Sequence, residues 1–258
     1  MKTNINYNES NLDTMAKMPD NFIDLTVTSP PYDGLRDYNG YVFDFESVAK
    51  ELYRVTKEGG VLVWNVNDST VDGSETLTSF KQALYFKEIG FNVHDTMIYA
   101  KEQIAFPSSN RYHQAFEYMF VFSKGKPKTV NLIQDRLNVS FGRKGKVNAR
   151  KKNGSVKKGE KDVVIREYSE RLNYWIIHNQ ERGIENEHPA VFPRKLAYDH
   201  IRTWTNEGDL VYDCFMGSGT TAVASISANR NWIGSEISEE YHKLIQKRLA
   251  PLRNNLFT

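Results

Sequence analysis

The sequence predicts an α/β protein in which helices cover both faces of a mostly parallel β-sheet. Three observations support this class. Short apolar runs that suit buried strands alternate along the chain with segments whose apolar residues recur at helical spacing. Glycines end several of these segments, and no internal repeat is apparent. Strands that are joined through helices pair in parallel, and a parallel sheet is buried on both faces.

The predicted elements follow one another along the chain in this alternating order. The predicted strands cover residues 22–27, 61–66, about 93–100, about 116–122, 210–212 and 232–236. Three helices are predicted from apolar positions at helical spacing: Phe45, Val48, Ala49, Leu52 and Val55; Phe80, Ala83 and Leu84; and Leu196, Ala197, His200, Ile201 and Trp204. The first starts at Asp44 and ends at Gly59-Gly60, and the second stops near Gly90. Two more are expected, a small-residue helix at 222–226 and a last helix from about Ser238 to about Leu249.

The composition is that of an ordinary globular chain. With 258 residues and 40% hydrophobic content, it can bury a sizeable core in one domain with an inserted lobe. A single cysteine, Cys214, excludes a disulfide framework and suits a reducing compartment. The six histidines lack metal-ligand spacing, and the sequence has neither an N-terminal apolar region nor a membrane-length apolar run. We therefore expect a soluble, cytoplasmic protein without a metal site.

Charge is distributed unevenly, although the net charge is only +2. The stretch 124–166 has fourteen basic and three acidic residues, which leaves 20 basic and 29 acidic residues elsewhere from totals of 34 and 32. This stretch also contains Gly142, Gly145, Gly154 and Gly159 and few apolar residues, which is typical of a segment that an anionic partner orders. Nucleic acid is the natural partner, and a solvated, flexible loop is the alternative.

The sequence Ser29-Pro30-Pro31-Tyr32 directly follows the first predicted strand. Two successive prolines fix the backbone φ angle and remove two N–H donors, so this segment cannot continue a strand ladder. We expect a stiff loop that holds its carbonyl groups and one aromatic ring in fixed directions.

A glycine-rich turn separates the strand 210–212 from the small-residue helix. Gly217 and Gly219 let a ligand approach the backbone closely, and the N–H groups at the helix start attract a negative group. The strand 232–236 ends in Glu236, seventeen residues after Gly219. A carboxylate about 20 residues after such glycines reaches the hydroxyls of a bound ribose in dinucleotide folds. This pattern indicates a site for an adenosine-bearing cofactor, and the alternative is that Glu236 only caps the last helix.

Two motifs in this order, Ser29-Pro30-Pro31-Tyr32 and Asp213-Cys214-Phe215-Met216-Gly217-Ser218-Gly219-Thr220, resemble those of S-adenosylmethionine-dependent DNA amino-methyltransferases of the beta arrangement. The segments 116–124 and 188–193 are similar to that family too, so the resemblance spans nearly the whole chain. Cys214 stands where the family commonly has proline. The resemblance implies a Rossmann-like methyltransferase fold in three parts: a catalytic half at 1–123, a basic target-recognition insert at 124–187, and a cofactor-binding half at 188–258.

The resemblance also implies which residues form each site. The catalytic residues would be Ser29, Pro30, Pro31 and Tyr32. S-adenosylmethionine would be bound by Asp213, Phe215, Gly217, Ser218, Gly219, Thr220, Glu236, Phe192 and Pro193. Double-stranded DNA would be bound by Arg143, Lys144, Lys146, Arg150, Lys151 and Lys152. Enzymes of this family are often dimers, so a homodimer is a further expectation.

The stiff loop suits methyl transfer to an exocyclic amino group. Hydrogen bonds from that group to Ser29 and to the Pro30 carbonyl would direct the nitrogen lone pair, while Tyr32 would stack on a flipped base. Serine at position 29 fits the pattern usual for cytosine-N4 enzymes of the family, and adenine N6 is the main alternative. Methylation at cytosine C5 is disfavoured because Cys214 lies inside the cofactor motif. More distant alternatives are an RNA amino-methyltransferase, a protein glutamine methyltransferase and a non-catalytic nucleic-acid-binding protein on this scaffold.

Overall fold

The structure is a computed structural model that describes residues 1–31, 43–101, 110–146, 149–157, 159, 162–177 and 193–254. The chain divides into two compact units. The main unit contains Met1–Asn131 and Asn173–Thr258, and the second unit, which we call the arm, contains Leu132–Leu172. The arm lies within the predicted insert 124–187, but flanking residues of that insert belong to the main unit. The functional division into three parts stays a prediction.

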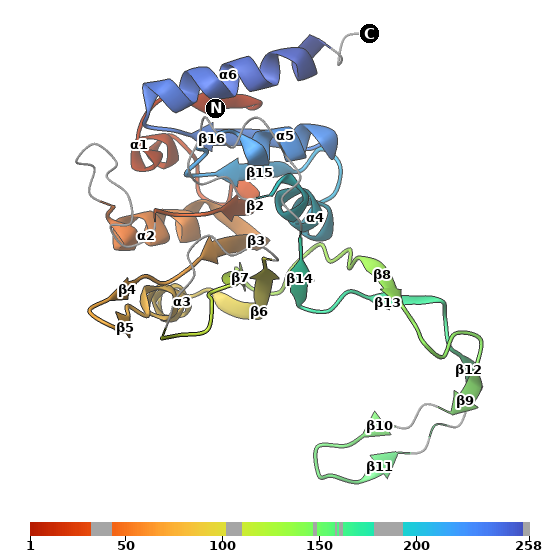
Figure 1. The fold of residues 1–258 in the computed structure, drawn as a ribbon. Coiled ribbons are helices and arrows are strands. Elements are labelled where there is room, and N and C mark those ends of the chain that lie inside the picture. The colour runs from red at the N-terminus through yellow and green to blue at the C-terminus, as the bar shows by residue number, and fades with distance from the viewer. Residues whose placement is uncertain are drawn as a thin grey trace. The chain divides into compact units, whose positions relative to one another are not determined.

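An eight-stranded sheet forms the centre of the main unit (Figure 1). Its strands are β1 (Ile5–Tyr7), β2 (Ile23–Thr28), β3 (Thr56–Val66), β6 (Asn92–Ala100), β7 (Phe116–Ser123), β14 (Tyr174–Ile176), β15 (Leu210–Asp213) and β16 (Asn231–Ser235). They are arranged in the order β1-β16-β15-β2-β3-β7-β6-β14. Only the pairs β3–β7 and β6–β7 are antiparallel, so the sheet is mostly parallel, as predicted.

Helices cover both faces of this sheet, which confirms the predicted α/β class. The helices are α1 (Asn11–Ala16), α2 (Phe45–Val55), α3 (Thr78–Glu88), α4 (Arg194–Trp204), α5 (Thr220–Ser227) and α6 (Glu239–Asn254). Side chains of β3 alternate between the faces: Leu62 and Trp64 pack with α1, α2 and α3, whereas Val61 and Val63 pack with α4 and α5. A separate cluster joins α5 to α6. Among the described residues, no helix has the length and apolarity to cross a membrane.

The junction between α2 and β3 differs from the prediction that the helix ends at Gly59-Gly60. The helix already ends at Val55, because Thr56 has an extended backbone with ψ of 130°, and the Thr56 hydroxyl bonds to the Leu52 carbonyl. Strand β3 then starts at Thr56, and the ladder with β2 shifts register so that residues 57–60 bulge from it. Gly59, with a φ of +79°, therefore lies inside the irregular start of a strand.

The predicted apolar face of α3 is also wrong in part. Phe80 and Leu84 are 40% and 68% exposed, whereas Gln82 is buried. The reason is a polar partner on the sheet, since the Trp64 indole N–H donates to Gln82 Oε1 at 2.8 Å. After β3, the chain forms a short hairpin of β4 (Thr70–Val71) and β5 (Ser74–Glu75) before α3 begins.

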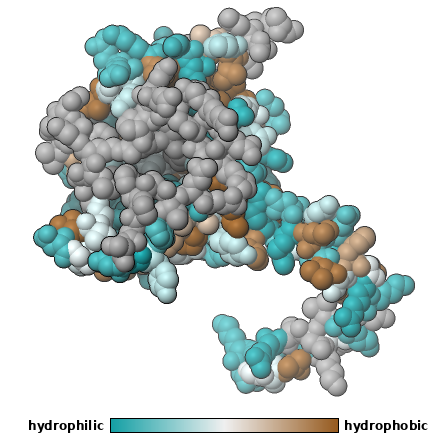
Figure 2. Space-filling model, viewed as in Figure 1, coloured by the Kyte–Doolittle hydropathy of each residue, from teal (hydrophilic) through white to brown (hydrophobic). Residues whose placement is uncertain are grey.

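The arm consists of three nested antiparallel ladders that the sequence did not predict. They pair β8 (Gln134–Leu137) with β13 (Tyr168–Glu170), β9 (Lys144–Lys146) with β12 (Asp162–Val164), and β10 (Ala149–Arg150) with β11 (Val156–Lys157). The Lys151 N–H donates to the Ser155 carbonyl at 2.7 Å and closes the tip. Figure 2 shows hydrophilic residues along much of the arm, with apolar ones between them.

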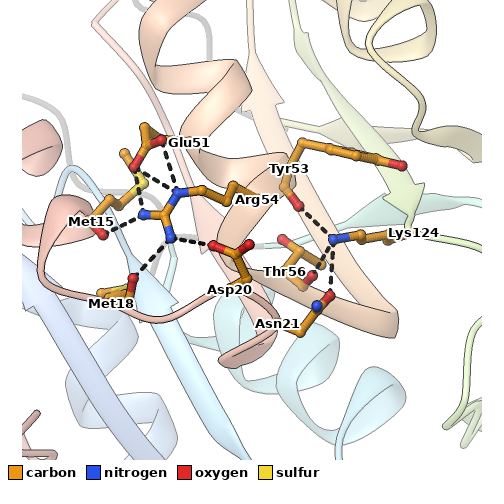
Figure 3. A network of polar contacts seen from close by, with 9 residues as sticks. All are labelled: Met15, Met18, Asp20, Asn21, Glu51, Tyr53, Arg54, Thr56 and Lys124. Carbon is orange, nitrogen blue, oxygen red and sulfur yellow. Dashed lines mark hydrogen bonds and ion pairs between the residues drawn. The ribbon is translucent and has the colours of Figure 1, made fainter.

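Two cations bond to the segment 15–21, which leads into β2 (Figure 3). The Arg54 guanidinium bonds to the Met15 and Met18 carbonyls and pairs with Asp20 and Glu51. A second cation, Lys124, was counted in the basic stretch 124–166 but is buried in the main unit. Its amine donates to three oxygens at 3.0–3.1 Å: Asn21 Oδ1 and the carbonyls of Tyr53 and Thr56.

Candidate active site at the carboxyl ends of the strands

Strands β2 and β15 lie side by side in the sheet and run parallel, with Tyr212 paired to Thr26. The chain continues from β2 to β3 on one side and from β15 to β16 on the other, so the strand order changes direction between them. Open α/β sheets bind ligands at the carboxyl ends of strands at such a point. Ser29, Pro30 and Pro31 follow β2 there, with Pro30 buried, while Tyr32 lies outside the described residues.

The glycine-rich turn follows β15 and has the geometry that its glycines permit. Gly217 and Gly219 have φ angles of +52° and +84°, in the left-handed region that favours glycine. Gly219 is the N-cap of α5, and a Cβ added there would approach Ile245 Cγ1 to 3.3 Å. The turn therefore has two positive-φ glycines, and at Gly219 its backbone packs closely against α6.

Glu236 follows β16 and connects two backbone segments. Its Oε2 accepts a hydrogen bond from the Gly217 N–H and its Oε1 accepts one from the Ser238 N–H, each at 2.8 Å. Burial raises the pKa of this carboxyl, although both hydrogen bonds oppose the shift. Each carboxylate oxygen can accept another hydrogen bond. This carboxylate thus fits the hydroxyls of an adenosine ribose as an acceptor, because it has acceptor capacity left after orienting the turn.

Arg248 of α6 holds the turn from its other side and was missed by the sequence analysis. Its Nη1 lies 3.1–3.2 Å from the carbonyl and hydroxyl oxygens of Ser218 and from the Thr220 hydroxyl. The hydroxyl oxygens of Ser218 and Thr220, both predicted to bind the cofactor, therefore accept hydrogen bonds from Arg248. Helical spacing from Ile245 is the signal that could have placed Arg248 on the buried side of α6.

Asp213, at the end of β15, is only 1% exposed. Its Oδ1 accepts hydrogen bonds from the Thr28 hydroxyl at 2.7 Å and from the Phe215 N–H at 3.0 Å, and its Oδ2 accepts one from the Thr221 hydroxyl at 2.6 Å. Burial raises the pKa of Asp213, and these three hydrogen bonds lower it in part. The Phe215 ring packs edge-on against Phe43, with centroids 5.2 Å apart.

The remaining predicted cofactor residues lie at the start of α4. Pro193 is the buried N-cap residue of this helix, which packs against α5 and β2. Phe192 lies outside the described residues. Within the described part of the chain, no group of three or more His, Cys, Asp or Glu side chains could hold a metal ion.

The basic side chains of the arm fall into two groups. Near its base, Arg166 pairs with Glu170 and Arg171 pairs with Asp135. Towards the tip lie exposed basic residues that have no ion pair with any described residue: Arg143, Lys144, Lys146, Arg150, Lys151, Lys152 and Lys157. The arm has twelve basic and five acidic residues in Leu132–Leu172. Its unpaired positive charge is therefore concentrated in the inner ladders.

Comparison with known proteins decides the family. The family model described as DNA methylase, for N6 and N4 methyltransferases, matches residues 23–247. The chain belongs to the DNA methylase family. This DNA methylase is 57% identical over 234 residues to the orphan methyltransferase M.BamHII of Bacillus amyloliquefaciens, which covers 88% of each chain. It is therefore a DNA methyltransferase of the type that modifies cytosine N4 or adenine N6.

Solved structures show the same fold as this DNA methylase. The cytosine-N4-specific PvuII DNA methyltransferase has a TM-score of 0.68 at 21% identity, covering 97% of this chain and 91% of its own. The M1.HpyAVI–SAM complex has a TM-score of 0.64 at 23% identity, covering 95% of this chain and 98% of its own. These likenesses confirm the Rossmann-like methyltransferase fold that the sequence predicts.

Proposed function

We propose that this DNA methyltransferase transfers a methyl group from S-adenosylmethionine to the exocyclic amino group of a base in double-stranded DNA. The observation that carries the proposal is the adjacency of the Ser29-Pro30-Pro31 segment and the glycine-rich turn at the ends of two neighbouring parallel strands. A hydrogen bond of 2.7 Å between Thr28 and Asp213 joins these strand ends. The cofactor, when bound, supplies an electrophilic methyl group.

The residues of the chain have two kinds of role in this proposal. Glu236 and the backbone of Gly217 and Gly219 hold the cofactor, because they combine acceptor capacity with close backbone approach. The Ser29 oxygen and the Pro30 carbonyl accept hydrogen bonds from the target amino group and orient its lone pair. Two prolines keep those acceptors rigid, which favours a reaction that depends on alignment.

We propose cytosine N4 as the acceptor. A serine oxygen is short and uncharged, so it has to lie close to the amino group, which suits the smaller pyrimidine ring. Digestion of methylated DNA to nucleosides, followed by mass spectrometry, tests this directly. N4-methyldeoxycytidine is expected, and N6-methyldeoxyadenosine alone would exclude cytosine as the acceptor but keep the amino-methyltransferase activity. The absence of both products would contradict the proposed function itself.

We propose that the arm binds the DNA. Support comes from its excess of basic residues and from the unpaired, exposed cations of its inner ladders. DNA phosphates attract such side chains regardless of base sequence, whereas ion-paired arginines have less charge to offer. A cytoplasmic location and a homodimer stay predictions, and light scattering tests the second.

A further inference from the structure

Asp213 is a buried carboxylate next to the candidate site that accepts three hydrogen bonds. Its three hydrogen-bond donors come from three different parts of the main unit: the last residue of β2, the glycine-rich turn and the first turn of α5. The β2 donor is Thr28, the residue directly before Ser29. The α5 donor is Thr221, which lies two residues after Gly219. One carboxylate therefore bridges the proposed target loop and the proposed cofactor loop.

The chemistry of the bridge fixes the direction of each bond. An unpaired buried charge is costly, so a carboxylate at this depth requires donors on its oxygens. Both threonine hydroxyls lie within 2.7 Å of Asp213 and supply one proton each, and the Phe215 N–H supplies the third. Thr221 Oγ1 also lies 3.4 Å from the Val27 carbonyl, which is a much longer contact than the 2.6 Å bond to Asp213. The Thr221 hydroxyl thus donates its proton to the Asp213 carboxylate.

We infer that Asp213 is a positioning residue, which fixes the spacing between the Ser29-Pro30-Pro31 loop and the glycine-rich turn through Thr28 and Thr221. This inference rests on the proposed function and replaces the expectation that Asp213 binds the cofactor. The carboxylate is 1% exposed, and its two oxygens accept hydrogen bonds from Thr28, Phe215 and Thr221. Methyl transfer requires the reacting atoms to lie about 3–3.5 Å apart, so a small change of loop spacing lowers the rate strongly.

Threonine variants test the inference while they keep the Asp213 side chain itself in place. Thr28→Val keeps the shape of the side chain and removes its proton donor, and Thr28→Ser restores the donor. Strand β2 also offers a matched control, because Thr26 is fully buried and its hydroxyl has no hydrogen-bond partner among the described residues. Thr26→Val removes the same atoms from the same strand without touching the bridge.

The measurements are the single-turnover rate of methyl transfer and, separately, the affinities for S-adenosylmethionine and for DNA. Thr28→Val is expected to lower the rate by roughly ten- to a hundredfold, which is the order of effect of a misplacement of about 1 Å. Both affinities should change much less, and Thr28→Ser and Thr26→Val should retain the wild-type rate. The double variant Thr28→Val with Thr221→Val should be slowed by less than the product of the single effects, because both act through one carboxylate.

Two results would overturn the inference. An unchanged rate in Thr28→Val would show that the bridge does not set the loop spacing. A loss of cofactor affinity in Thr28→Val as large as its loss of rate would instead indicate that Asp213 takes part in cofactor binding. Wild-type protein that binds S-adenosylmethionine but methylates no DNA would instead contradict the proposed function, so the two failures are distinguishable.

Discussion

Glu236 has an observed structural role beside the binding role that we propose for it. Its carboxylate accepts the Gly217 and Ser238 N–H groups, so it shapes the turn that would hold the cofactor. Glu236→Ala should weaken S-adenosylmethionine binding by about ten- to a hundredfold, given that a hydrogen bond to a charged group contributes about 1.5–3 kcal/mol. Isothermal titration measures this, with the exposed Glu240→Ala as the control. Unchanged affinity in Glu236→Ala would remove this residue from the site.

Asp213 gives a prediction about pH. Its folded-state pKa is raised from 3.8 mainly by burial. A raised carboxyl pKa contributes stability that is present below the unfolded value of 3.8 and is lost as pH rises through the folded value. The free energy of unfolding of the wild type, relative to Asp213→Asn, should therefore fall as the pH rises above the unfolded value of 3.8. Urea unfolding of both proteins measures it, and a relative increase with pH would contradict the assigned direction.

Lys124 is a buried cation whose role is structural. Its amine donates to Asn21 and to the carbonyls of Tyr53 and Thr56. Lys124→Ala should lower the free energy of unfolding by on the order of 2–3 kcal/mol, because buried carbonyl acceptors lose a charged donor. Its exposed neighbour provides the control, and Lys126→Ala should change stability by less than about 0.5 kcal/mol. Equal unfolding midpoints for the two variants would argue against this network.

At the scale of elements, the arginines near the β8–β13 ladder form ion pairs, whereas the basic residues of the inner ladders do not. The triple variant Lys144→Ala, Lys151→Ala and Lys152→Ala should flatten the slope of log DNA affinity against log salt by about 0.9 for each lost phosphate contact. The control variant, Arg166→Ala with Arg171→Ala, removes two cations that already have carboxylate partners, so its slope should change less. Identical slopes for the triple variant and the wild type would indicate that the inner ladders are a solvated segment without phosphate contacts.

For the whole molecule, the buried apolar clusters of the described residues all lie in the main unit. None of the three buried apolar clusters of the described residues contains a residue of Leu132–Leu172. The base of the arm is narrow, since the Arg171 N–H donates to the Ile133 carbonyl at 2.8 Å. Replacing residues 133–171 with a short glycine–serine linker should therefore keep the fold and the cofactor affinity but abolish DNA binding. Titration with S-adenosylmethionine and gel-shift with DNA measure both, and loss of cofactor binding would contradict independent units.

The sequence by itself determined the class of the main unit and the order of its motifs. Strands such as 61–66 are apolar runs, and their period and length can be read locally. Gly217 and Gly219 could be predicted as a turn because their backbone freedom is a local property, and the structure gives both a positive φ. The proline pair after β2 excluded a continued strand for a similarly local reason.

Only the tertiary structure decided which polar groups meet. Gln82 is buried because Trp64 donates to it, and the Thr28–Asp213 bond joins residues 185 positions apart in the chain. Strand β14 could not be predicted either, since its pairing with β6 is long-range. The ladders of the arm follow the same rule, because polar strands have no apolar period and their pairing depends on backbone hydrogen bonds across the hairpin. Local patterns specify elements, whereas hydrogen bonds between distant residues require the folded arrangement that brings them together.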